Sequence, residues 1–446
     1  MTAADQRIHP LRNPQVLCWV LYDWANSAYT TLLITVVVAY LQRIVFPADQ
    51  WGNVGPIVWA WGISLSMFLG ALLSPIVGAI ADAHGNKRRW LGITALGGSI
   101  ASIVLGLVAP GHYVLVVALF ITANLMLELS LSVYNGFLPE IATEREVNQV
   151  SAWGFGLGYV GGGIALLLAL GIIQFGDRIG LTAVETRLRA GLVLMGCWWG
   201  IFTLPALWVL SDSPPRSRPE STTATASSSF RDVVRTLKGL RSNPPLAFFL
   251  VAFLFYNDGV QTVISQSSTF ALQELAFTES DLMGVILMLQ FLALPGALLV
   301  AKLADRFGEK PSLMACLLLW VGVLTTALFI RSQIWFWVLA AAIALVLGGT
   351  QSVSRSMMAG MIPQNRNAEY FGFFNLSGKA TSWLGAFLFG AIFALTGNSR
   401  WAIFGLLPLF LIGAGFLSRV RPAQHVVRGQ RDAPGPCEDP VQRENL

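Results

Sequence analysis

Hydrophobic residues dominate the chain in long stretches that short polar segments separate. A helix needs about 20 mostly apolar residues to cross a bilayer. None of the stretches shows the alternation of apolar and polar residues that a membrane β-strand requires. We therefore predict an all-α polytopic membrane protein with twelve transmembrane helices. The predicted spans lie near residues 16–46, 56–80, 90–109, 113–138, 150–175, 189–210, 246–270, 281–303, 312–331, 334–361, 369–396 and 400–420.

One long polar interruption divides the twelve spans into two sets of six. Residues 211–230, SDSPPRSRPESTTATASSSF, have the Ser, Thr and Pro content of a flexible linker. Residues 230–240 then place apolar side chains at helical spacing with cations between them. This pattern fits an amphipathic helix on the membrane surface and a short solvated helix equally well. We predict a first half at 1–210, a linker at 211–245, a second half at 246–420 and a disordered tail at 421–446.

The two sets of spans carry matching motifs, which indicates an internal duplication. ADAHGNK (81–87) follows the second span, and ADRFGEK (304–310) follows the eighth. LPE (138–140) and IPQ (362–364) close the fourth and tenth spans at almost the same offset. A parallel duplication of a six-helix unit explains both pairs. Two such halves are typical of alternating-access transporters, in which the binding site lies between the halves near the membrane midplane.

Composition supports a membrane protein, and the basic residues predict its orientation. Only 12% of the residues are charged and 54% are hydrophobic, whereas soluble domains carry roughly 25% charged residues. Most of the 29 Lys and Arg residues fall in the loops that share a side with both termini. We therefore expect both termini to be cytoplasmic and the protein to lie in the cell (inner) membrane. This basic inner face explains the pI of 9.2 without a nucleic-acid partner.

Several motifs resemble known transporters. VGAIADAHGNKRR and VAKLADRFGEKP resemble the loop motif of the major facilitator superfamily, although Ala301 replaces the usual glycine of the second copy. YDWANSAY (22–29), YNDGVQTVI (256–264) and GGTQSVSRSMMAGMIP (348–363) resemble the vacuole-effluxer-like family, which includes amino-acid effluxers of fungal vacuoles. The resemblance implies the major facilitator fold and covers essentially the whole chain.

The same resemblance implies gating residues in the two loops. It implies that Asp82 and Asp305 each pair with a neighbouring helix N-terminus and an Arg, which closes the cytoplasmic side in one state. A carboxylate at a helix N-terminus is stabilised by about 0.3–1 kcal/mol. The alternative is that these loops serve only as a topology signal. The gating candidates are Asp82, Lys87, Asp305 and Lys310.

Five ionisable residues lie inside predicted spans one, four, seven, ten and eleven: Asp23, Glu128, Asp258, Arg355 and Lys379. A charge at a helix centre costs about 2.5–3.5 kcal/mol, so we expect these groups to face a wet cavity or one another. All except Arg355 lie about 7–12 residues from the cytoplasmic helix ends, which places them in a common belt. The facilitator resemblance implies that spans one, four, seven and ten line the central cavity.

Helical spacing predicts polar faces on spans one and seven. On span one the polar side chains fall within one arc of about 160°, and a similar arc on span seven includes Ser265, with Gly259 offering a bend. The alternative is that Tyr22, Trp24 and Tyr29 form an interfacial aromatic belt. We predict that substrate and protons bind Tyr22, Asp23, Asn26, Tyr29, Glu128, Asn257, Asp258, Gln261, Arg355 and Lys379.

These side chains allow two roles for each carboxylate. A buried Asp or Glu can take and release a proton as the cavity changes sides, or it can be a permanent partner of Lys379 or Arg355. The two cations can also hold a substrate carboxylate, while the amides bind an amine. This combination suits an amino acid, and it equally allows a short peptide or an organic anion.

Span five carries Gly154, Gly158 and Gly162 on one face, a pattern that permits close helix packing. It also resembles the exporter motif of facilitator antiporters, except that Tyr159 stands in place of a proline. We favour close packing.

No motif indicates catalysis, and we expect no enzyme activity, cofactor or metal. The four cysteines and four histidines are scattered, without the spacing of a metal site or a disulfide. A membrane sensor would need an appended domain, and a lipid flippase on this fold would need a continuous apolar groove. We expect a monomeric secondary transporter that exports a small polar solute and is coupled to protons. An amino acid is the first candidate for that solute.

Overall fold

The computed structural model describes residues 9–212, 243–275, 277, 279–363, 366–379 and 382–420. Within these ranges the α-helix is the dominant element and no strand occurs. The predicted linker helix at 230–240 and the tail at 421–446 lie outside the described residues. The side chain of Lys379 lies outside the description as well.

The first half is built from six long helices and three short ones. Five-residue π-helical segments, Leu33–Val37 and Leu41–Val45, continue α1 through α2, so that the first span runs over Pro14–Val45. The helices are α1 (Pro14–Leu32), α2 (Val38–Tyr40), α3 (Ala48–Trp51), α4 (Val54–His84), α5 (Lys87–Leu107), α6 (Tyr113–Gly136), α7 (Leu138–Ile141), α8 (Val147–Phe175) and α9 (Val184–Val209).

The second half repeats this arrangement and completes the predicted twelve-helix fold. Its helices are α11 (Pro244–Leu275), α12 (Glu279–Phe307), α13 (Glu309–Ala327), α14 (Gln333–Met361), α15 (Asn367–Lys379), α16 (Ser382–Thr396), α17 (Ser399–Phe404) and α18 (Leu407–Arg419). In the described part of the chain, 11 helical segments are long and apolar enough to cross a membrane, and Leu384–Thr396 is a shorter apolar helix. The predicted eleventh span, 369–396, corresponds to α15 and α16.

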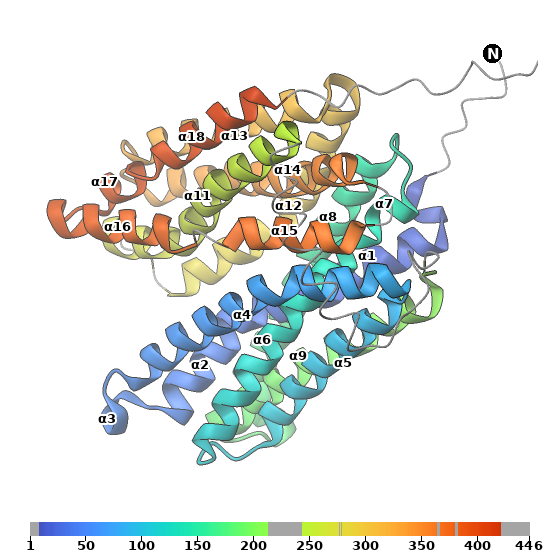
Figure 1. Cartoon of the computed structure of the whole chain (residues 1–446). Helices are drawn as coiled ribbons and strands as arrows, with labels where there is room; N and C mark the ends of the chain where they lie inside the picture. The colour runs from blue at the N-terminus through green and yellow to red at the C-terminus, as the bar shows by residue number, and fades with distance from the viewer. Residues whose placement is uncertain are drawn as a thin grey trace, which may run out of the picture.

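The two halves pack along one end of the molecule. Across the halves, α8 packs on α12 and α14, and α15 packs on α4 and α6. Figure 1 shows the ribbons of the two halves close together near α7 and diverging toward α3, α16 and α17. We call the end near α7 the terminal end, because the described chain begins there at His9 and ends there at Val420. The other end is the opposite end.

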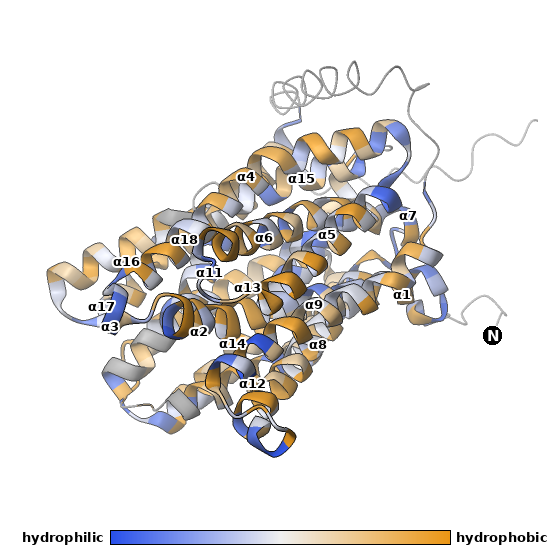
Figure 2. Ribbon diagram, turned by 90° about the horizontal axis from the view of Figure 1, so that it is seen from below, coloured by the Kyte–Doolittle hydropathy of each residue, from blue (hydrophilic) through white to orange (hydrophobic). Residues whose placement is uncertain are grey.

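The outer surface is apolar along the helices. Trp61, Phe68 and Trp208 are among the large hydrophobic side chains that are mostly exposed. In Figure 2 hydrophobic residues follow the lengths of the helices, and hydrophilic residues gather at helix ends and in loops. A surface this apolar is suited to lipid rather than water. The chain is therefore a multi-pass membrane protein.

Glycines on α8 allow α1 to approach closely, as the sequence predicts. A Cβ atom added at Gly158 would lie 2.7 Å from Ser27 Oγ, and one added at Gly162 would lie 2.5 Å from Thr31 Oγ1. Gly259 has a packing role too: it lies inside the continuous helix α11, and a Cβ atom there would meet the Phe410 ring at 2.7 Å. The bend predicted at this position is therefore wrong.

The turn between α4 and α5 positions two of the gating candidates. Gly85 ends α4 in the left-handed conformation, at φ 59°, which a glycine adopts without strain. The chain then reverses and Lys87 begins α5, so its ammonium lies 3.2 Å from the Asp82 carboxylate.

Candidate functional site

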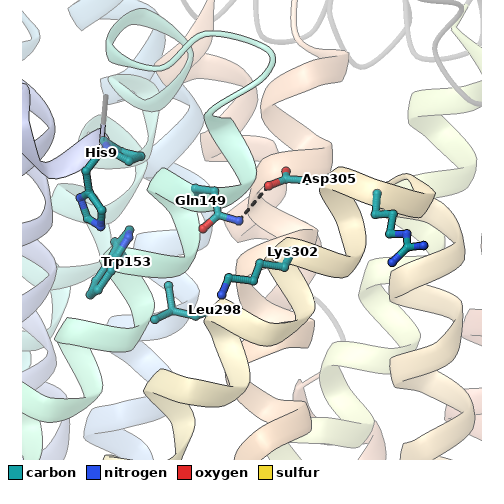
Figure 3. Close-up of a pocket in the computed structure, with 8 residues that line it drawn as sticks. His9, Gln149, Trp153, Leu298, Lys302 and Asp305 are labelled. Atoms are coloured by element: carbon teal, nitrogen blue, oxygen red, sulfur yellow. Dashed lines mark hydrogen bonds between the residues drawn. The ribbon is translucent and has the colours of Figure 1, made fainter. Parts of the chain in front are cut away.

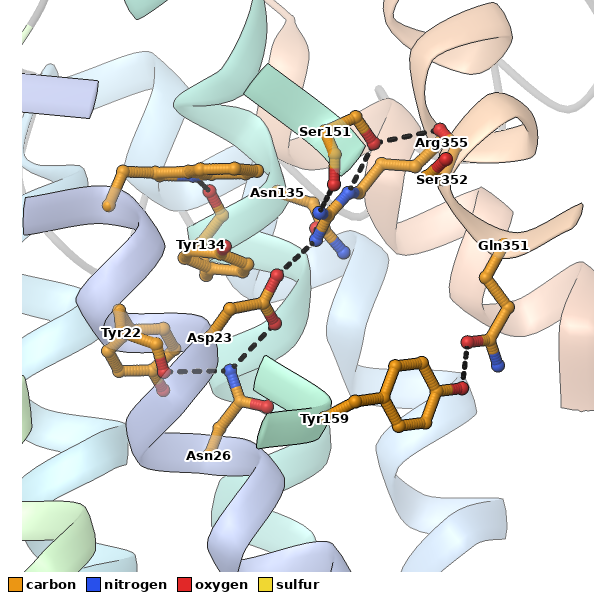
Figure 4. A network of polar contacts seen from close by, with 11 residues as sticks. Tyr22, Asp23, Asn26, Tyr134, Asn135, Ser151, Tyr159, Gln351, Ser352 and Arg355 are labelled. Atoms are coloured by element: carbon orange, nitrogen blue, oxygen red, sulfur yellow. Dashed lines mark hydrogen bonds and ion pairs between the residues drawn. The ribbon is translucent and has the colours of Figure 1, made fainter. Parts of the chain in front are cut away.

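A buried ion pair joins the two halves inside the membrane region. Arg355 Nη1 of α14 lies 2.9 Å from Asp23 Oδ2 of α1, and the two residues are only 2% and 3% exposed. Figure 4 shows the pair where α1, α8 and α14 meet. Two charges removed from water in this way require further polar partners to offset their lost hydration.

The first half supplies those partners, as Figure 4 shows. Arg355 donates from Nε to Ser151 Oγ at 3.0 Å and from Nη2 to the Ser151 carbonyl at 2.8 Å. Its Nη1 lies 3.4 Å from Asn135 Oδ1, and Asn26 Nδ2 donates to Asp23 Oδ1 at 3.3 Å.

Aromatic rings of the first half also surround the Arg355 guanidinium. It lies over the rings of Trp19, Tyr134 and Phe155, at 4.6, 5.8 and 3.9 Å from their centroids. One side chain of the second half is thus surrounded by the first half.

At the terminal end, Asp82 holds the start of α15. Asp82 Oδ2 accepts from the backbone N–H of Glu369 at 2.9 Å. The implied contact with a helix N-terminus is therefore present, but the cation beside Asp82 is Lys87 rather than an Arg. Lys87 also pairs with Glu140, whose carboxylate accepts from Asn367 Nδ2 at 3.0 Å.

Close packing accompanies this polar contact. A Cβ atom added at Gly78 would lie 2.3 Å from the Ala368 carbonyl oxygen, and one at Gly136 would lie 2.8 Å from Ala368 Cα. The first turn of α15 therefore fits against α4 and α6 only because both helices carry glycine there.

The second copy of the loop motif differs from the implied pattern, because its described partners are side-chain amides and not a backbone N–H with an Arg. Asp305, at the end of α12, accepts from Asn148 Nδ2 at 3.1 Å and from Gln149 Nε2 at 2.8 Å, both at the start of α8. Lys310 is not part of this contact between the halves. Its Nζ donates to the carbonyls of Ser418 and Val420, at 2.7 and 2.6 Å, within the second half.

Two further hydrogen bonds extend the contact toward the middle of the bundle. Gln290 Nε2 of α12 donates to Thr31 Oγ1 of α1 at 2.7 Å. Tyr159 of α8 donates from its hydroxyl to Gln351 Oε1 of α14, and both side chains are only partly buried. Tyr159, which replaces a proline of the exporter pattern, therefore bridges the halves.

Asp258 lies in a different environment, inside the second half. It is 1% exposed, and its Oδ2 accepts at 2.9 Å from the N–H of Gly385 in the first turn of α16. Its Oδ1 has no hydrogen-bond partner among the described residues. The neighbouring Asn257 donates to the Gly378 carbonyl of α15 at 2.9 Å. Asp258 is thus a buried carboxylate that a hydrogen bond from α16 holds within the second half.

The remaining candidates do not join a single polar face. Tyr22 packs against Tyr134 at 4.8 Å between ring centroids, and Tyr29 packs against Trp199 at 5.0 Å, both within the first half. Tyr29 therefore lies away from the contact between the halves, whereas Tyr22 adjoins it through Tyr134, over whose ring the Arg355 guanidinium lies. Glu128 is buried where α6 packs on α4, and Gln261 is exposed on α11.

Sequence reasoning missed most of the neutral residues in these contacts and one of the acids, Glu140. Asn135, Ser151, Asn148 and Gln149 are uncharged, and such residues are common at the ends of membrane helices. Glu140 had a signal, because it belongs to the repeated motif that closes the fourth span. No group of three or more His, Cys, Asp or Glu side chains that could hold a metal ion occurs among the described residues.

Comparison with known proteins decides the family. The sequence profile described as "Vacuole effluxer Atg22 like" matches residues 58–433. The chain belongs to this family. It is 31% identical over 425 residues to "Uncharacterized MFS-type transporter YxiO" of Bacillus subtilis, a match that covers 93% of this chain and 97% of the relative. It is 24% identical over 405 residues to autophagy-related protein 22 of Kluyveromyces lactis, covering 83% and 80% of the two chains.

Solved structures share the fold. The major facilitator transporter FucP in its outward conformation matches with a TM-score of 0.69 and 14% identity, covering 92% of this chain and 99% of FucP. The proton:xylose symporter XylE matches with a TM-score of 0.70 and 11% identity, covering 92% and 95%. The predicted major facilitator fold and vacuole-effluxer-like family are confirmed. The chain is a membrane transporter of this family and not an enzyme.

Proposed function

We propose that the protein exports a small zwitterion, an amino acid, in exchange for protons, by alternating access between its two halves. The observation that carries the proposal is that carboxylates of each half reach across to the other half near the terminal end. Asp23 holds Arg355, Asp82 holds the start of α15, and Asp305 holds the start of α8. Because these contacts are polar, water or a solute can replace them when the halves separate.

Small side chains between the halves support such a movement. Ala152 of α8 packs against Ala297 and Ala301 of α12. Surfaces of small residues allow close approach without interlocking. The terminal end is therefore held closed mainly by its polar contacts, and breaking them opens the path to that side.

The Asp23–Arg355 pair supports an amino acid as the solute. A free amino acid carries an ammonium and a carboxylate, the same two charges that meet at this pair. When the halves separate, each partner loses the other, and an unpaired buried charge is costly. A zwitterion can satisfy both at once, with its carboxylate on Arg355 and its ammonium on Asp23. A simple anion or cation can satisfy only one of them.

Asp258 is the proposed proton carrier. A charged carboxylate is costly inside a membrane helix, and adding a proton removes that charge. Its contact with α16 ties this exchange to a helix of the predicted eleventh span. Glu128 is the second candidate for the same role.

The test of the proposed function is transport in liposomes by Asp258→Asn. We expect this variant to lose accumulation of labelled amino acids driven by a pH gradient, while exchange between internal and external amino acid remains measurable. The matched control is Asp177→Asn, because Asp177 is an exposed carboxylate on the opposite end. Accumulation by the Asp258→Asn variant with normal pH dependence would assign Asp258 a structural role and transfer the proton role to Glu128.

We further propose that the terminal end faces the cytoplasm, as the distribution of Lys and Arg predicts. A cysteine introduced by Ser221→Cys, in the linker, should resist an impermeant maleimide added to intact cells and react after the cells are lysed. Labelling in intact cells would reverse the orientation and, with it, the direction of export.

A further inference from the structure

A pocket of about 660 Å³ lies between the two halves at the terminal end. Figure 3 shows Gln149 and Trp153 of α8 on one side and Leu298, Lys302 and Asp305 of α12 on the other. The residues that line it are His9, Pro10, Gln149, Trp153, Leu298, Lys302, Asp305 and Arg306. The pocket thus has walls from both halves and lies apart from the Asp23–Arg355 pair and from Asp258.

The lining carries two positive charges, on Lys302 and Arg306, and one negative charge, on Asp305, so its net charge is positive. Asp305 accepts hydrogen bonds from two amides of α8. Lys302 and Arg306 are exposed, and neither makes an ion pair with any residue that the structure describes. In Figure 3 the Lys302 side chain extends toward α8. Two cations without acidic partners at the end of a membrane helix favour an anionic ligand.

An apolar ridge leads along α12 to these cations. Leu299, Leu303 and Phe307 are 55%, 39% and 59% exposed, and their spacing of four residues places them on one side of the helix. Trp153, an amphipathic ring of the kind that membrane–water interfaces favour, packs near His9 at 5.3 Å between centroids. An apolar ridge ending in cations matches a molecule with acyl chains and a charged head.

We propose that this pocket binds the headgroup of an anionic phospholipid from the leaflet at the terminal end. Its phosphate pairs with Lys302 and Arg306, and an acyl chain lies along Leu299 and Leu303. Because both halves form the walls, the bound lipid favours the conformation in which the terminal end is closed. This effect on conformation rests on the proposed alternating access, whereas the binding itself does not.

The test is native mass spectrometry of the full chain, released from detergent with either phosphatidylglycerol or phosphatidylcholine. We expect retention of phosphatidylglycerol over phosphatidylcholine. Each basic residue near an anionic surface contributes about a fivefold change in binding, so the Lys302→Gln/Arg306→Gln variant should bind phosphatidylglycerol roughly 25-fold more weakly. The matched control is Arg88→Gln/Arg89→Gln, which removes two exposed cations at the same end and should bind as the wild type does.

Four results would overturn the proposal. Equal retention of phosphatidylcholine would show that the pocket does not recognise the headgroup charge. An unchanged affinity in the Lys302→Gln/Arg306→Gln variant would place the lipid elsewhere. Displacement of phosphatidylglycerol by millimolar inorganic phosphate would assign a free-anion site. Binding only after deletion of residues 2–8 would identify the chain's own N-terminal segment as the occupant. These readouts measure lipid binding, so they would stay the same if the proposed amino-acid transport were not observed.

Discussion

Arg355 is the residue through which the two halves are most strongly connected. Its guanidinium pairs with Asp23 and donates to Ser151, and three aromatic rings of the first half surround it. A Cβ atom added at Gly154 would lie 2.6 Å from Arg355 Nη2. Any side chain at this position would therefore clash with the guanidinium. Removing one partner of a buried pair costs about 3–5 kcal/mol, because the other charge stays buried and unpaired.

A double-mutant cycle on this pair measures its contribution. We expect Asp23→Asn and Arg355→Gln each to lower the free energy of unfolding by about 3–5 kcal/mol, and the double variant to lose less than the sum. Denaturant titration of the protein in detergent provides the measurement. Glu185→Gln is the matched control, because its pair with Arg189 is partly exposed and should contribute less than about 1 kcal/mol. Strict additivity of the two single losses would contradict the pairing.

The sequence predicted the charged members of this network but not their partners. Asp23 and Arg355 are conspicuous because a charge inside an apolar stretch requires compensation. Ser151 and Asn135 are small neutral residues near helix ends, where nothing in the sequence distinguishes a ligand of Arg355 from a solvated side chain. Which carboxylate pairs with which cation depends on tertiary packing. The sequence was equally consistent with carboxylate–cation pairs and with charges that contact a substrate.

At the scale of helices, the two loop motifs close the terminal end by different contacts. Asp82 holds a helix N-terminus with Lys87 beside it, whereas Asp305 holds two side-chain amides and Lys310 ties α18 to its own half. A carboxylate at a helix N-terminus is stabilised by about 0.3–1 kcal/mol. The first motif should therefore govern how often α15 separates from α4.

Hydrogen exchange at the start of α15 tests this difference. Asp82→Asn removes the charge that faces the Glu369 N–H, so we expect exchange in the first turn of α15 to become about two- to fivefold faster. Ligand binding should persist. Lys310→Gln is the control, because it removes a lysine of the same motif that contacts only the second half, and α15 should exchange as in the wild type. Unchanged hydrogen exchange in Asp82→Asn would contradict the gating role. The loop would then serve only as a signal for membrane topology.

Helical periodicity placed the residues of α1 correctly around the helix but did not predict what each side faces. Asp23 and Asn26 lie in the contact between the halves, while Tyr29, on the same predicted arc, packs against α9. The reason is that α1 is covered on two sides, by α8 and by α9. A polar arc on a helix therefore marks protein contacts as well as a cavity.

At the scale of the whole molecule, the repeated motifs were sufficient to predict two parallel six-helix halves. They could not predict which end of the bundle is closed, because the same sequence must form the contacts of both states in an alternating-access cycle. The structure represents the state closed at the terminal end, where Asp23, Asp82 and Asp305 make their contacts across the halves. In the proposed alternating-access cycle, the complementary state breaks these contacts.

Paired distance measurements by double electron–electron resonance test this alternation most directly. One pair of spin labels, at Arg145→Cys and Ser418→Cys, spans the terminal end, and the other, at Gly111→Cys and Arg331→Cys, spans the opposite end. All four positions are exposed, and Cys197 and Cys437 are replaced by serine. We predict that Asp23→Asn increases the terminal-end distance and decreases the opposite-end distance in the same fraction of molecules. Distances that stay fixed, or that both increase, would contradict alternating access by these two halves.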